Sequence, residues 1–328
     1  MQATPAKTSK QRWFAPLKLA VSLSLLVLLL WTLDAVAVAR VLGQLPLAAV
    51  AAAMVLLIVQ TAVLGLRWWL VMAAIEAPLK LGKILPLTFM GVFFNQVLPT
   101  SFGGDAVRIW QAHRLGIQTE AAVIGVLLER ISGVFGLVVL TALGALTLGV
   151  EIGSQAVRLG LLLTLPAAVA GILVLALLDR MPERWRRLPV LKEATRLARD
   201  SRRVFLAPGT ALPLLLLSLL SHGLAAGAVY AFALGLQADL PLWTCIALFS
   251  AVILVTTIPI SFAGWGLREG AMVVLFAFAG VNADTALALS LAFGVALLAA
   301  SLPGCACWLA WRGPPMLESA PRPMPDSR

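Results

Sequence analysis

The sequence predicts an all-α polytopic membrane protein with about six full spans and two oppositely oriented re-entrant hairpins of broken helices, which form an inverted repeat. Of its 328 residues, 61% are hydrophobic and 12% are charged, with a mean hydropathy of +0.97. A typical soluble domain has roughly 25% charged residues. The apolar residues gather in long runs, and two shorter runs each end at a proline inside a similar motif. Together these observations indicate spanning helices and two interrupted ones.

Six apolar runs are long enough to cross a hydrocarbon core, which takes about 20 helical residues. They cover residues 17–39, 46–74, 120–149, 158–178, 211–236 and 285–311. The first run exceeds the apolar core of a signal peptide, which has roughly 7–15 residues, so we expect an uncleaved span. We therefore expect a cytoplasmic tail at 1–16, one membrane domain at 17–312 and a disordered tail at 313–328.

The loop at 179–208 sets the orientation, because it holds nine basic residues against four acidic ones. Basic loops are retained on the cytoplasmic side, and this loop can be reached from a cytoplasmic N-terminus only if the short run 84–98 does not cross. By the same counting of membrane crossings, the short run 241–258 does not cross either. We therefore expect two re-entrant hairpins, broken at Pro99 and Pro259, that enter from opposite faces, with both termini cytoplasmic.

The net charge of +10 is explained by this orientation and does not indicate a nucleic-acid partner. Within the basic loop, apolar residues recur at helical spacing between the arginines. This pattern favours a helix lying on the anionic inner leaflet, and a solvated linker is the alternative.

The two interruptions resemble each other at a constant offset along the chain. VLPTSFGGDAVR at 97–108 aligns with TIPISFAGWGLR at 257–268. The identical residues are Pro99, Ser101, Phe102, Gly104 and Arg108 in the first segment and Pro259, Ser261, Phe262, Gly264 and Arg268 in the second. A broken helix leaves backbone N–H and C=O groups free, and these are tolerated in a membrane only beside protein or a water-filled cavity. Inverted repeats with such breaks are typical of transporters.

Six charged residues fall within or beside the predicted spans and breaks: Asp105, Arg108, Glu129, Arg130, Arg268 and Glu269. A charge near the bilayer centre costs about 2.5 kcal/mol or more unless it is paired or faces water. One hypothesis is that Arg108 and Arg268 bind a phosphate headgroup, successively or together, because a guanidinium forms a planar fork that matches phosphate. The alternative is that all six residues form structural ion pairs.

Other residues at the breaks have two possible roles each. Asn95, Gln96, Ser101 and Ser261 either contact a headgroup or satisfy freed backbone groups. The prolines and glycines are expected to act as backbone hinges. These are Pro99, Gly103, Gly104, Pro259, Gly264 and Gly266.

Three motifs give the chain its resemblance to a known family: NQVLPTSFGGDAVR at 95–108, LLER at 127–130 and GWGLREG at 264–270. Together they resemble the lysylphosphatidylglycerol synthase transmembrane family, also called flippase-like membrane proteins. The resemblance extends over 17–312 and implies a domain that moves lipids or lipid-linked headgroups between leaflets. It also implies a bacterial inner-membrane location. Some relatives carry a cytosolic aminoacyltransferase domain, which the segment 313–328 is too short to form, so synthase activity is not expected.

The function expected from these features is transport of a phosphorylated lipid, with a membrane lipid as partner and no cofactor, metal or catalytic residue. No G-x-x-x-x-G-K-[ST] loop for an ATPase occurs in the sequence. Two alternatives remain open. One is a membrane-embedded transferase on a lipid-linked substrate, with Asp105 or Glu129 as base. The other is a scaffold that recruits a lipid-biosynthesis enzyme through the loop 179–208.

Overall fold

The computed structural model describes residues 35–98, 102–148, 155–180, 189–258 and 264–310, and these are almost entirely helical. The long helices are α3 (Leu47–Ala74), α6 (Thr119–Thr147), α7 (Gln155–Ala176), α10 (Pro208–Gly235) and α13 (Ala283–Ala310). The shorter ones are α2 (Ala35–Gly43), α4 (Leu81–Val97), α5 (Gly103–Arg114), α9 (Pro189–Phe205), α11 (Leu242–Thr256) and α12 (Leu267–Phe276), with single 3₁₀ turns at Leu178–Arg180 and Ala277–Ala279.

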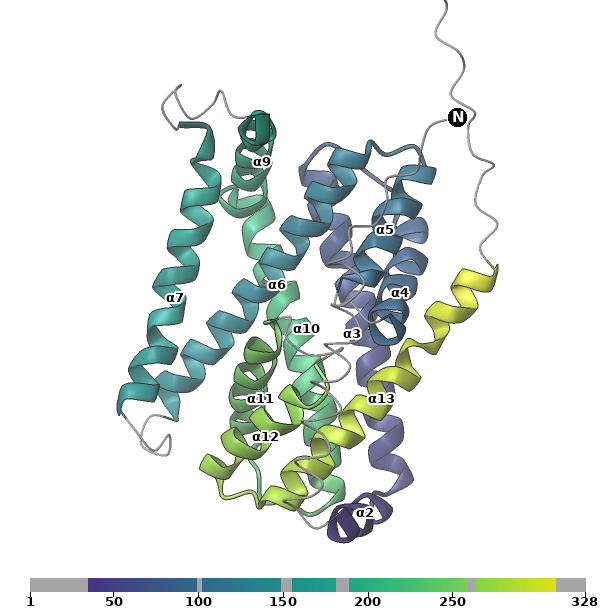
Figure 1. Ribbon diagram of the computed structural model, residues 1–328, viewed down its shortest axis with the longest axis vertical. Coiled ribbons are helices and arrows are strands. Elements are labelled where there is room, and N and C mark those ends of the chain that lie inside the picture. The colour runs from purple at the N-terminus through teal and green to yellow at the C-terminus, as the bar shows by residue number, and fades with distance from the viewer. Residues whose placement is uncertain (1–34, 99–101, 149–154, 181–188, 259–263, 311–328) are drawn as a thin grey trace, which may run out of the picture.

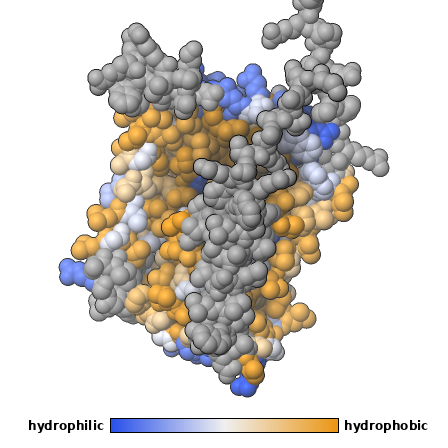
Figure 2. Space-filling model, viewed as in Figure 1, coloured by the Kyte–Doolittle hydropathy of each residue, from blue (hydrophilic) through white to orange (hydrophobic). Residues whose placement is uncertain are grey.

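Five of the six predicted spans are confirmed as apolar helices long enough to cross a membrane, α3, α6, α7, α10 and α13. The predicted first span lies mostly outside the described residues, and its last part, 35–39, belongs to α2. Figure 2 shows hydrophobic residues over the middle of one face and hydrophilic residues near its top and bottom. This distribution is that of a multi-pass membrane protein whose flank contacts hydrocarbon.

The two short apolar runs form α4 and α11, and each packs against the short helix that follows it, α5 or α12. The α4–α5 pair lies in the upper half of the molecule and the α11–α12 pair in the lower half (Figure 1). The breaks at Pro99 and Pro259, with Ser101 and Ser261, lie outside the described residues. That these hairpins are re-entrant stays a prediction, because their helices are placed relative to one another and not to a bilayer.

The order and bounds of the helices recur along the chain. The helix α3 at Leu47–Ala74 has its counterpart in α10 at Pro208–Gly235, and α4, α5 and α6 have theirs in α11, α12 and α13 at nearly the same shift. The packing recurs as well, because α5 contacts α6 as α12 contacts α13, and α4 contacts α13 as α11 contacts α6. The helix α3 packs directly on its counterpart α10.

Two apolar clusters stabilise the two halves. One joins the start of α3, through Ala53 and Leu57, to α10, α11, α12 and α13. The other joins the end of α3, through Trp68 and Met72, to α4, α5, α6 and α9. The stretch of α3 between these clusters contains Arg67, which is 4% exposed.

The basic loop is helical over 189–205, as its helical spacing of apolar residues predicted. That this helix lies on a leaflet stays a prediction. Ion pairs hold α9 to the ends of other helices. Arg196 pairs with Glu120 at 2.7 Å, and Arg203 pairs with Glu76 at 2.9 Å. Residues 181–188 of the predicted loop lie outside the described part of the chain.

Candidate functional site

A polar cavity of about 190 Å³ lies between α3, α4, α5, α6, α10 and α11. The polar side chains that line it are Arg67, Thr88, Asn95, Asp105, Arg108, Glu129, Arg130, His222 and Thr257. Five of these residues are charged, three arginines against two carboxylates. The ionised groups at this cavity therefore carry one excess positive charge.

Glu129, on α6, is the centre of the charged network and is 1% exposed. Its Oε1 accepts hydrogen bonds from Nε of Arg67 at 2.9 Å and from Nη2 of the same guanidinium. Its Oε2 accepts from Nη2 of Arg108 at 3.0 Å. One carboxylate thus joins an arginine of α3 to an arginine of α5, and such charge-assisted bonds are about twice as strong as neutral ones.

Asp105 connects Arg108 to the third arginine of the cavity, Arg130. Its Oδ1 lies 3.2 Å from Nη2 of Arg108, and its Oδ2 lies 2.8 Å from Nη2 of Arg130. The guanidinium of Arg108 also lies over the ring of Trp68, with its Cζ 4.7 Å from the ring centroid. Arg130 is the most exposed of the three arginines, with 42% of its side chain accessible.

Arg67 retains donor capacity, because its Nη1 is buried and makes no hydrogen bond with any residue that the structure describes. A buried, unpaired donor is costly and calls for a partner. Because Arg67 lines the cavity, an anion held there would supply an acceptor for this atom.

Two glycines make room for these arginines. A Cβ added to Gly133 of α6 would lie 2.9 Å from Nη2 and 3.2 Å from Nη1 of Arg67. A Cβ on Gly91 of α4 would lie 2.7 Å from Cγ of Arg108. Arginine side chains can occupy these places only because the facing helices have no side chain there.

Gly104 has a packing role that the sequence interpretation did not foresee. A Cβ added to Gly104 would overlap the backbone carbonyl of Gly91, so α4 and α5 cross in direct backbone contact. Asn95 stabilises the same crossing, because its Oδ1 accepts a hydrogen bond from the N–H of Gly104 at 2.9 Å. Asn95 therefore satisfies a free helix-end group and also lines the cavity. Gly103 is buried at the start of α5, and Gln96, partly buried, is not among the cavity residues.

The second predicted arginine lies in a separate cluster. Nη2 of Arg268 is 2.7 Å from Oε1 of Glu269, and its Nε donates to Oγ of Ser290 at 3.2 Å. The guanidinium stacks on Trp265 with Cζ 5.0 Å from the ring centroid. Neither Arg268 nor Glu269 is among the described residues that line the polar cavity.

The two remaining predicted hinge glycines precede this cluster and have left-handed backbone conformations. Gly264 has φ of +81° and Gly266 has φ of +82°, a region that glycine adopts far more readily than other residues. The N–H of Gly266 donates to the carboxylate of Glu269, which thereby caps the start of α12.

The structure thus brings Asn95, Asp105, Arg108, Glu129 and Arg130 to one site and leaves Arg268 and Glu269 elsewhere. Sequence reasoning missed Arg67, although it is the only charged residue in the apolar run 46–74. His222 also lines the cavity, and its Nε2 lies 2.9 Å from the carbonyl oxygen of Gly133. Among the described residues, no three His, Cys, Asp or Glu side chains come together as metal ligands.

A family model described as the lysylphosphatidylglycerol synthase transmembrane region matches residues 16–304. The match includes α2 to α12, the charged cavity and most of α13. It confirms the resemblance carried by the three sequence motifs. No curated protein matches the chain.

Proposed function

The chain belongs to the lysylphosphatidylglycerol synthase transmembrane family, and from that premise we propose that it moves a lipid with a phosphorylated headgroup between the two leaflets. The family assignment makes it a multi-pass membrane protein involved in lipid handling. The finer proposal concerns what is moved and where it binds. It rests on one observation, the cavity in which three arginines face two carboxylates.

The charge of the cavity favours an anionic headgroup. Arg67 and Arg108 are 4% and 3% exposed, and charges this deep are retained in membrane proteins chiefly where they serve substrates or ions. A phosphate can accept several hydrogen bonds from guanidinium groups in a planar arrangement. It would neutralise the excess charge and supply the acceptor that Nη1 of Arg67 lacks.

The repeated architecture supports transport over static binding. Many transporters consist of two repeats of inverted topology, with broken helices near the midplane and a binding site between them. We interpret the recurrence of α3–α6 as α10–α13 as such a repeat, with α4–α5 and α11–α12 as re-entrant hairpins. Their positions in opposite halves of the molecule agree with this interpretation (Figure 1).

The two arginines of the repeat are proposed to act successively. Arg108 lines the cavity, whereas its counterpart Arg268 is held by Glu269 and Ser290. In this mechanism the conformation described here is the one that receives the headgroup at Arg108. Rearrangement of the α11–α12 hairpin then exposes Arg268 to it on the other side, while the acidic neighbours balance whichever arginine is empty.

The proposal is tested with purified protein in vesicles that contain fluorescent phosphatidylglycerol, whose movement between leaflets is followed by chemical quenching of the outer label. We expect the protein to accelerate movement. Arg67→Gln and Arg108→Gln should each slow it roughly 10- to 150-fold, the equivalent of losing about 1.5–3 kcal/mol from a hydrogen bond to a charged group. Arg114→Gln is the matched control, because Arg114 lies on the same helix as Arg108 and outside the cavity.

Two results would contradict the proposal. One is the absence of acceleration for phosphatidylglycerol and for every other phosphorylated lipid tested. The other is equal transport by the control and by the two cavity variants, which would mean that transport does not depend on these arginines.

A further inference from the structure

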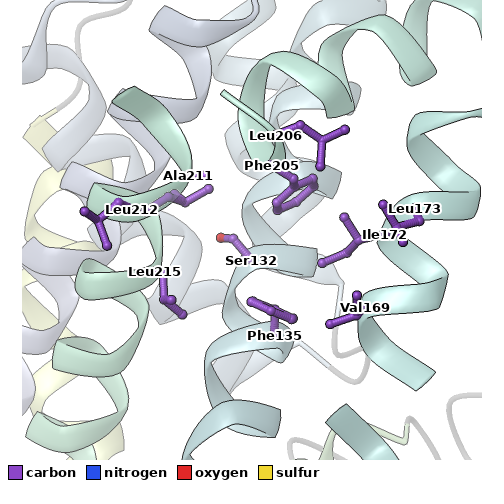
Figure 3. A pocket seen from close by; sticks show the side chains of 11 residues that line it. Ser132, Phe135, Val169, Ile172, Leu173, Phe205, Leu206, Ala211, Leu212 and Leu215 are labelled. Carbon is purple, nitrogen blue, oxygen red and sulfur yellow. The ribbon is translucent and has the colours of Figure 1, made fainter. Parts of the chain in front are cut away.

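A second hollow, of about 250 Å³, lies between α6, α7, the end of α9 and α10. Figure 3 shows side chains from these helices pointing into it, and all are apolar except Ser132. The walls include Phe135 of α6, Ile172 of α7, Phe205 at the end of α9 and Leu215 of α10. We call this hollow the apolar groove. An apolar pocket of this kind suits a hydrocarbon chain better than a polar ligand.

The apolar groove and the arginine cavity share α6 as a common wall. Glu129 and Gly133 line the cavity, and Ser132 and Phe135 line the groove. At about 100° per residue, Glu129 and Gly133 point in nearly one direction, and Ser132 and Phe135 point roughly a third of a turn away, so the two hollows lie against neighbouring faces of α6. A lipid whose headgroup occupies the cavity therefore has an apolar site for a chain on the neighbouring face of α6.

The repeat contains a second groove at the corresponding position. A hollow of about 300 Å³ lies beside α2, the start of α3, α10 and α13. Four of its residues correspond, at the same offset that separates Pro99 from Pro259, to residues of the first groove. These pairs are Leu45 with Phe205, Met54 with Leu214, Ala292 with Ser132 and Val295 with Phe135.

The charge beside the first groove indicates which lipid would enter it. Phe205 is the last residue of α9, and Leu206 follows it at the groove. The helix α9 bears five basic and two acidic residues, PVLKEATRLARDSRRVF. Basic residues at a membrane surface attract anionic lipids, by about 1 kcal/mol each, so an anionic phospholipid would be concentrated at this opening.

We infer that the apolar groove binds an acyl chain of an anionic phospholipid while its phosphate occupies the arginine cavity. By the correspondence within the repeat, the second groove binds an acyl chain of a lipid in the opposite leaflet. This inference rests on the proposed function and adds the substrate class to it, a phospholipid recognised by chain and headgroup together. A soluble headgroup alone would then bind but would lack the contribution of the chain.

The test is Ile172→Trp, which fills the groove from α7, where Ile172 is 9% exposed. Leu163→Trp is the matched control, because it lies on the opposite side of the same helix and is 64% exposed. We expect Ile172→Trp to slow phosphatidylglycerol movement at least about tenfold, the affinity that roughly two buried methylene groups supply. Binding of soluble glycerol phosphate should stay unchanged in both variants. Equal transport by Ile172→Trp and the control would overturn the inference.

A second measurement uses the unmodified protein, and so does not depend on the folding of a variant. Phosphatidylglycerol with a photoreactive group in its acyl chain should label α6, α7 and α10 at the groove, above the labelling of Leu163. Uniform labelling of lipid-facing residues would overturn the inference. If glycerol phosphate fails to bind while groove labelling persists, the proposed headgroup site is wrong and the chain site stands.

Discussion

Gly133→Ala is the sharpest perturbation of the proposed headgroup site, because it adds one methyl group and removes no charge. The added carbon would lie 2.9 Å from Nη2, 3.2 Å from Nη1 and 3.3 Å from Cζ of Arg67. Comfortable contacts between carbon atoms lie near 3.5–4.0 Å. The guanidinium of Arg67 would therefore have to move by about half an ångström to restore ordinary contact distances.

That movement is opposed by the bonds of Arg67 to Glu129, of which the one from Nε measures 2.9 Å. Overpacking of a filled site typically costs about 1–3 kcal/mol, while replacing glycine by alanine in a helix contributes about 0.8–1.0 kcal/mol in the opposite direction. Gly171→Ala, on α7, gains the helix contribution without the clash, because its added carbon would meet nothing within 4 Å. Gly133→Ala should therefore be less stable than Gly171→Ala by about 1–3 kcal/mol.

Both variants are compared in detergent by thermal unfolding and by titration with glycerol phosphate. Since the displaced guanidinium is the one with a free donor, Gly133→Ala should also weaken glycerol phosphate binding by about tenfold or more, a loss of about 1.4 kcal/mol. Gly171→Ala should bind as the unmodified protein does. Equal stability and equal affinity of the two variants would refute the assigned contact between α6 and Arg67.

Three further predictions follow from the same contacts. Gly104→Ala should prevent the close crossing of α5 with Gly91 of α4, so the variant should elute as poorly folded protein on size-exclusion chromatography. Gly82→Ala is the control and should fold normally, because its added carbon meets nothing within 4 Å. Normal folding of both variants would contradict the crossing. Glu129→Gln should lower the unfolding free energy by about 3–5 kcal/mol, because buried arginines lose their shared carboxylate. In thermal unfolding, added glycerol phosphate should restore part of this lost stability. Unchanged stability of the variant would argue against the network. Burial raises the pKa of Asp200, on α9, despite the opposing charges of nearby arginines. Its contribution to stability is therefore greatest below its ordinary pKa, about 3.9, and is lost as pH rises through the folded-state value. Relative to Asp200→Asn, the unmodified protein should gain thermal stability as pH falls from neutral toward 4, and parallel pH profiles of the two proteins would contradict this.

Most of the fold could be predicted from the sequence, because its signals are local. Length and hydropathy of an apolar run are enough to identify a spanning helix, and α3, α6, α7, α10 and α13 lie where the runs predicted them. The constant offset between the two proline motifs also anticipated the recurrence of helix bounds in the second half. The family assignment followed from short motifs for the same reason.

The site could be predicted only in part. Asp105, Arg108, Glu129 and Arg130 stood out because charges are rare inside apolar runs, and they do meet in one cavity. The two similar motifs predicted equivalent roles for Arg108 and Arg268, yet Arg268 bonds to Glu269 and Ser290 outside that cavity. The repeat fixes where each arginine lies along its helix and does not fix which neighbours face it.

The sequence by itself determined the long helices, their repetition and most of the buried charges, Arg67 excepted, since each depends on composition and spacing along one segment. Only the tertiary structure decided that Arg67 of α3 joins Glu129 of α6, two residues far apart in the chain. It also decided that Gly91 and Gly133 leave the space that the arginines occupy. Such contacts depend on the angle and depth at which helices cross, and these follow from the combined shapes of all packed side chains.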